Sequence, residues 1–318
     1  MPPKKGSSKV ISKAMKDEVE PAVTGEPQRE ATEATSKKRK QTTDSNRPQK
    51  APRRSGRSAS KSQPSQEQLL NYMLSKSAEE LCRPEDETAD IQSRKNIRTY
   101  SSSVLNPFEE LLCAIILSRP ISHRLGLRTI RTVLNEPYKF NSAKAVKNAG
   151  EEKIYEAVWE AKTQHKGKTT EEIGRVADVV LEKFTGKGDK DGTQLKKVLD
   201  DNGGDVEKAL DALKAGIKGF GETGASIFRR RVQWTWEDGY PFVDDKTGVA
   251  LKKLGLPDDA EELRKLLEEH WGQLDVGNVS GDNEQMKKRR AFTVILERAV
   301  GAELEGKVEL LVEAATNS

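Results

Sequence analysis

The chain has 318 residues, 33% of them charged, and a mean hydropathy of −0.77, so we expect part of it not to fold on its own. Its net charge of +4 is uneven: residues 1–65 hold 16 Lys and Arg against 7 Asp and Glu, and the remainder holds 39 against 44. Cys82 and Cys113 are the only cysteines, which excludes a disulfide framework and a four-cysteine zinc or iron–sulfur site within the chain.

Residues 1–65 have the composition of a disordered basic tail, and we expect a helical domain over residues 66–318. No Phe, Trp or Tyr precedes Tyr72, so the tail cannot bury enough apolar surface to offset its ordering entropy. One compact basic cluster predicts nuclear import through an import receptor, although a generic solvated tail has the same composition: Lys37, Lys38, Arg39 and Lys40.

No apolar run approaches the 18–20 or so residues that span a bilayer, and the first residues carry no apolar signal core. We therefore expect a soluble, intracellular protein without a membrane partner. We also expect it to be monomeric and to use no metal or other cofactor.

The first clear helix signal is the segment Asn106-Pro107-Phe108-Glu109. It combines an N-cap, a first-position proline and a third-position glutamate, a variant of the capping box. The apolar run up to Leu117 predicts a helix at the centre of the core, and Pro120 should end it.

The rest of the domain shows helical periodicity and no convincing alternation of apolar and polar residues. Asp258 is the expected N-cap of one helix, and a last helix should carry Phe292 and Val300. The sequence therefore predicts an all-α fold, with further helices near residues 151–163, 170–184, 206–214 and 222–234.

The most informative segment lies between two of these helices and consists of Ile217, Lys218, Gly219, Phe220 and Gly221. Two glycines permit positive φ angles and a close approach of another backbone, while the Ile and Phe would pack the turn. Free amides at the corner and at the start of the next helix suit a phosphate oxygen. A tight helix–helix corner without a ligand is the alternative interpretation.

A second signal follows this corner at Asp244. Its position predicts the N-cap of a helix that Gly255 ends. Trp234 and Trp236 precede it, and we consider them candidates to line a pocket, although tryptophans beside helices more often belong to the core.

These segments, in this order, resemble the helix-hairpin-helix superfamily of base-excision DNA glycosylases, whose best-known branch is endonuclease III-like. The helix after Asn106 is similar to the opening helix of that family, Ile217–Gly221 to its hairpin, and Val243-Asp244 to its catalytic element. The resemblance spans about residues 106–271. It implies binding to double-stranded DNA in the nucleus and repair by base excision.

The resemblance also implies roles for single residues. Asp244 would be the catalytic carboxylate that stabilises an oxocarbenium-like transition state. A helix cap without a catalytic role is the alternative interpretation. Thr223 occupies the position of the nucleophilic lysine of bifunctional members, so the implied enzyme is monofunctional and leaves an abasic site. The segment from Arg119 to His123 departs from the family's usual sequence.

Several basic residues are candidate DNA contacts or, equally, parts of a solvated helix surface: Arg229, Arg230, Arg231, Arg119, His123 and the run Lys287-Lys288-Arg289-Arg290. Two other functions remain open. One is a helix-hairpin-helix module that binds DNA without catalysis, and the other is a chromatin-associated scaffold.

Overall fold

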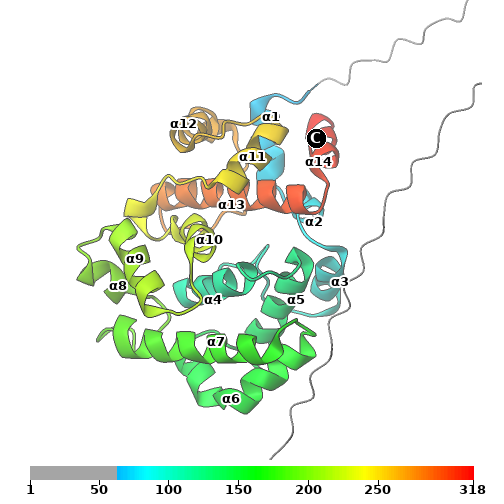
Figure 1. Cartoon of the computed structure of the whole chain (residues 1–318). Coiled ribbons are helices and arrows are strands. Elements are labelled where there is room, and N and C mark those ends of the chain that lie inside the picture. The colour runs from blue at the N-terminus through cyan, green and yellow to red at the C-terminus, as the bar shows by residue number, and fades with distance from the viewer. Residues whose placement is uncertain (1–62) are drawn as a thin grey trace, which may run out of the picture. The chain divides into compact units, whose positions relative to one another are not determined.

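The computed structural model describes residues 63–318, and these residues form an all-α structure without a β-strand (Figure 1). The tail expected over residues 1–65 lies almost wholly outside the described residues. The first helix begins at Gln66, with Ser65 as a capping-box N-cap. The α-helices of the described part are α1 Gln66–Leu74, α2 Lys76–Leu81, α3 Glu85–Ser93, α4 Pro107–Leu117, α5 His123–Leu134, α6 Ala143–Glu160, α7 Lys166–Val179, α8 Lys196–Asp201, α9 Val206–Gly216, α10 Glu222–Val232, α11 Asp245–Leu254, α12 Ala260–His270, α13 Glu284–Leu304 and α14 Val308–Thr316.

The expected opening helix is α4, and its capping box is confirmed. The side chain of Asn106 accepts a hydrogen bond from the amide of Glu109 at 3.0 Å, and the Glu109 carboxylate accepts one from the amide of Asn106 at 2.8 Å. Nearly every residue of α4 is buried, which agrees with a helix that is apolar on all sides. The helix ends at Leu117, three residues before Pro120.

Other expected helices are present with shifted limits. The segment expected near 151–163 belongs to α6, which begins at Ala143 and changes direction at Gly150, where φ is 76°. The segment expected near 170–184 is α7 followed by a π-helical turn, Val180–Phe184. The prediction of Asp258 as an N-cap was wrong. Asp259 caps α12 by accepting from two backbone amides, and Asp258 pairs with Lys252.

The helices of residues 63–318 build two hydrophobic cores. The first core lies among α4 to α10 and includes Phe108, Phe140 and Phe228. The second core lies among α1, α11, α12, α13 and α14 and includes Met73 and Phe292. Helix α10 packs on α4 in the first core and also contacts α13 of the second, so α10 and α13 are where the two groups of helices meet (Figure 1).

Candidate functional site

A cleft of about 1200 Å³ lies where the two groups of helices meet, and it is lined by residues from both. Helix α13 supplies one wall with Arg290, Val294, Glu297, Gly301 and Leu304, which recur every three or four residues and therefore share one face of the helix. Other parts of the wall come from the end of α1 and from α2, from the loop before α4, from the loop between α4 and α5, from the starts of α10 and α11, and from the loop before α13. The volume is sufficient for a nucleotide-sized ligand.

The glycine corner predicted from the sequence joins α9 to α10. Ile217 and Phe220 are buried in the first core, as expected, while Lys218, Gly219 and Gly221 are exposed. Gly219 has a φ of 101°, a conformation that a residue with a side chain rarely adopts. Within residues 63–318, the amides of Gly219 and Gly221 donate no hydrogen bond. These donors therefore face outward at the start of α10, as an anion site requires.

A carboxylate lies beside this corner and holds one of the expected DNA contacts. Glu172 of α7 pairs with Arg119, and its Oε1 would be 3.3 Å from a β-carbon built on Gly219. Both side chains are largely buried, so Arg119 is committed to Glu172 although it lines the cleft. Burial lowers the pKa of the Arg119 guanidinium. The prediction of Arg119 as a phosphate contact is therefore corrected, since its charge is already neutralised.

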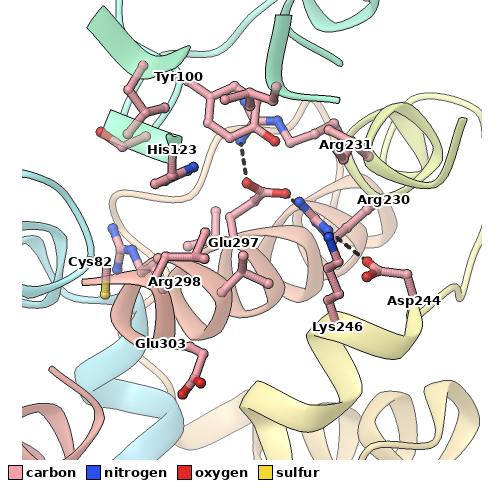
Figure 2. Close-up of a pocket in the computed structure, with 18 of the residues that line it drawn as sticks. Cys82, Tyr100, His123, Arg230, Arg231, Asp244, Lys246, Glu297, Arg298 and Glu303 are labelled. Carbon is pink, nitrogen blue, oxygen red and sulfur yellow. Dashed lines mark hydrogen bonds and ion pairs between the residues drawn. The ribbon is translucent and has the colours of Figure 1, made fainter. Parts of the chain in front are cut away.

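Asp244 lies at the start of α11 and lines the cleft (Figure 2). Its Oδ1 accepts from the amide of Thr247 at 3.2 Å, so the predicted helix cap is confirmed. Its Oδ2 accepts from the hydroxyl of Thr247 and from Nη1 of Arg230, both at 2.7 Å. Burial alone would raise the pKa of the Asp244 carboxyl, but the charge of Arg230 and the bonds from Thr247 outweigh it and hold that pKa below its usual value. Asp244 is therefore ionised at neutral pH.

Arg230 links Asp244 to a second carboxylate on the opposite wall. Its Nε donates to Glu297 of α13 at 2.6 Å, and Figure 2 shows the three side chains in a row across the cleft. Two carboxylates and one guanidinium leave this group with one net negative charge. Sequence reasoning missed Glu297, because no motif connects a glutamate of α13 with an arginine 67 residues earlier.

Arg231 is the second buried arginine of α10. Its Nε and Nη2 both donate to the carboxylate of Glu110 at 2.8 Å, and its guanidinium stacks on Tyr100 at 4.3 Å. Arg230 and Arg231 are 5% and 2% exposed. Each is buried and already paired with carboxylates, which disfavours the predicted contact with DNA phosphate. Arg229 is only partly buried, pairs with Glu207 and stacks on Phe242.

The two tryptophans proposed to line a pocket do not line this cleft. Trp236 is buried in the first core against Phe228, at 5.1 Å between ring centroids. Trp234 is 8% exposed and packs under the guanidinium of Arg290. The prediction is corrected for both residues, because the start of the connection between α10 and α11 packs these rings into the interior.

Two other candidates do line the cleft. Thr223, in the first turn of α10, is exposed and stands between the glycine corner and the cleft. His123 begins α5, and burial lowers the pKa of its imidazole below 6.5, so it is neutral at physiological pH. Lys246, the second residue of α11, also lines the cleft.

The basic cluster Lys37–Lys40, predicted to direct nuclear import, lies outside the described residues. In the described part, no helix combines the length and apolar character needed to cross a bilayer. Over the same residues, 63–318, no three His, Cys, Asp or Glu side chains are grouped as a metal site would require. Compared with family models, curated proteins and solved structures, the chain matches none of them.

Proposed function

We propose that this chain binds double-stranded DNA as a helix-hairpin-helix protein and hydrolyses the bond between a base and its sugar. One observation carries the proposal: an ionised carboxylate, Asp244, lines a cleft of about 1200 Å³ that begins beside an exposed glycine corner. The corner would anchor the DNA backbone, and the cleft would receive a nucleotide extruded from the helix.

The glycine corner offers binding through oriented donors rather than through bulk charge. The domain from residue 66 onward carries more acidic than basic residues, so a broad electrostatic attraction to DNA is not available. The outward amides of Gly219 and Gly221 and the first turn of α10 offer hydrogen bonds and the partial positive charge of a helix N-terminus. Such contacts set the position of the DNA without selecting a sequence.

Asp244 would act through its charge. Breaking the base–sugar bond leaves positive charge on the sugar, and the row of Asp244, Arg230 and Glu297 has one net negative charge to stabilise it. The electron pair of the broken bond leaves with the base, and a water oxygen then bonds to the sugar carbon. Three hydrogen bonds already engage the Asp244 carboxylate, and its pKa is lowered, so it is a weak base that stabilises charge more than it removes a proton.

Thr223 makes the product an abasic site. A hydroxyl cannot form the Schiff base that leads to strand cleavage, and Thr223 stands where the related enzymes carry a lysine. The strand should therefore remain intact until hot alkali cleaves it at the abasic position.

One observation favours a second function, that of a DNA-binding module without catalysis. Arg230 occupies Oδ2 of Asp244 and weakens the negative field that the cleft offers to a sugar cation. In that case the corner would bind DNA and the cleft would have no chemical role.

Excision assays distinguish the two functions. The full-length chain is incubated with duplexes that carry uracil, an alkylated base or an oxidised base, and abasic sites are revealed by hot alkali. We expect alkali-dependent cleavage of at least one duplex and none with Asp244→Asn, while both proteins bind the duplex equally. Binding without excision of any base would favour the non-catalytic module.

We also propose that the chain acts in the nucleus through the cluster Lys37–Lys40. A fluorescent fusion of the full-length chain should accumulate there, and replacing the four residues by alanine should disperse it.

A further inference from the structure

Arg290 of α13 is a buried cation that lines the cleft and makes no hydrogen bond or ion pair within residues 63–318. It is 6% exposed, and its Nη1 is buried without any hydrogen-bond partner. Its one close polar contact is the face of Trp234, whose ring centroid lies 5.1 Å from the guanidinium carbon. A guanidinium carries five N–H donors, and desolvating them without acceptors is costly.

The other buried arginines near the cleft each hold a carboxylate. Arg230 holds Asp244 and Glu297, Arg231 holds both oxygens of Glu110, and Arg298 holds Glu79. Arg290 therefore forms no ion pair of its own, although the charges of Glu110 and Glu297 still act on it. Burial, followed by the like charge of Arg231, lowers the pKa of Arg290 to about 10, which still leaves it protonated at neutral pH. A buried, protonated arginine that faces a cleft and has no acceptor from the chain indicates that a ligand supplies the acceptor.

The charges along the cleft are ordered. Asp244, Arg230 and Glu297 together carry one net negative charge, Arg231 pairs with Glu110 and also lies 3.8 Å from Glu297, and Arg290 carries one positive charge without an ion pair. Seven residues separate Arg290 from Glu297, about 10 Å along the axis of α13. The end of the cleft at Glu297 therefore favours a positively charged group of a ligand, and the end at Arg290 favours a negatively charged or acceptor group. The distance between them is about the length of a nucleoside.

We propose that Arg290 binds the carbonyl oxygens of the extruded base, so that the cleft selects bases with oxo groups over bases that lack them. The inference rests on the proposed function, because it assumes that a base enters the cleft. Trp234 holds the guanidinium plane, and a planar fork of donors matches adjacent acceptors on a base edge. A base without carbonyl oxygens would leave Arg290 desolvated and unsatisfied, which is a strong basis for rejection.

A backbone phosphate is a poorer match for this position. Phosphates run along the outside of the duplex, whereas Arg290 is nine-tenths buried and the base is the part of an extruded nucleotide that goes deepest.

The same contact would assist the reaction. When the bond between the sugar carbon and the base nitrogen breaks, its electron pair moves onto the base and increases the negative charge on the carbonyl oxygens. Arg290 would stabilise that charge while the row containing Asp244 stabilises the sugar cation. The oxygen of a water molecule bonds to the sugar carbon, and one of its protons ends on the departing base.

Binding to duplexes that cannot be hydrolysed tests the selectivity without depending on turnover. Each duplex contains one nucleotide with a 2′-fluoro sugar, which resists loss of the base. Its base is uracil, hypoxanthine or 8-oxoguanine, or 1,N6-ethenoadenine as the control base without a carbonyl. We expect the full-length chain to bind at least one oxo-base duplex about 10- to 100-fold more tightly than the ethenoadenine and undamaged duplexes. Arg290→Met should remove this preference, with Arg290→Gln as a second variant that keeps a polar side chain.

Arg289→Met is the matched control, because Arg289 adjoins Arg290 on α13, pairs with Glu237 and does not line the cleft. It should keep the preference. Wild-type protein that binds all duplexes equally, or a preference that survives in Arg290→Met or Arg290→Gln, would overturn the inference. A preference for oxo bases without excision of any base would instead overturn the proposed hydrolysis and leave the role of Arg290 standing.

A thermal melt adds a readout that a purely structural arginine would not give. Because Arg290 has no ion pair, Arg290→Met should melt at the same or a higher temperature than the wild type. A clear loss of stability would show that the arginine supports the fold, and would count against the proposed binding role.

Discussion

At the scale of single residues, Asp244 is both a helix cap and an ionised carboxylate. A single substitution can remove the charge and keep the cap. Asn caps helices as well as Asp does, so Asp244→Asn keeps the bond from the Thr247 amide but loses the charged bond from Arg230. We expect a loss of about 2 kcal/mol in the free energy of unfolding at pH 7. The measurement is urea denaturation of both proteins.

The pH dependence of that difference follows from the pKa of Asp244. Because folding lowers this pKa below its ordinary value of 3.8, the stability that the charge contributes is complete above pH 3.8 and is lost as the pH falls further, through the folded-state pKa. The difference between wild type and Asp244→Asn should therefore be the same from pH 8 to pH 5. A difference that shrinks within this range would mean that the pKa is raised instead.

Arg231 and Glu110 form a buried pair whose partners depend on each other. Arg231→Met would leave the Glu110 carboxylate buried without its two hydrogen bonds, and should cost about 3–5 kcal/mol. Adding Glu110→Leu should recover most of that loss, since two apolar side chains replace both charges. A double-mutant cycle by chemical denaturation measures this. Additive effects of the two changes would disprove the dependence.

At the scale of elements, the two glycines of the corner between α9 and α10 should have different roles. One is required by the backbone conformation, and the other by the approach of a phosphate. Gly219 has a positive φ and lies against Glu172, so Gly219→Ala should lower both stability and DNA affinity. Gly221 has a φ of −106°, and nothing lies within 4 Å of a β-carbon built on it. Gly221→Ala should therefore leave stability unchanged and weaken DNA binding, because the added methyl group blocks the approach of a phosphate.

Melting temperatures and the Kd for a duplex, measured for both variants, check this prediction. If Gly221→Ala binds DNA as tightly as the wild type, the corner is only a turn and the anchoring role is lost.

The elements that could be predicted from the sequence are those with local signals. The capping box of α4, the Asp244 cap and the Gly255 stop of α11 each depend on residues within one turn, and all three are present. Helix α1 begins with a local signal, the capping box of Ser65 and Gln68, whereas its Leu69, Leu70 and Met73 face partners more than 150 residues later in the chain. No pattern within a few residues indicates such long-range contacts.

At the scale of the whole described region, the cleft lies where two hydrophobic cores meet along α10 and α13, and both charged and apolar side chains line it. The sequence indicated Asp244 and the glycine corner, but not that Arg230 and Arg231 would turn inward. Their partners Glu297 and Glu110 lie 67 and 121 residues away. A run of three arginines is typical of a solvated surface, and only tertiary packing distinguishes the buried two from Arg229.

The central claim is that Asp244 drives excision of a base from DNA in this cleft, and a single-turnover rate tests it most directly. The excision rate is measured at saturating protein for wild type, Asp244→Asn and Asp245→Asn, the last being a control carboxylate that is exposed and lines the same cleft one residue further on. We predict a fall of about 100- to 1000-fold for Asp244→Asn at unchanged DNA affinity, and a rate within a few-fold of wild type for Asp245→Asn. Equal excision by Asp244→Asn and wild type would contradict the claim.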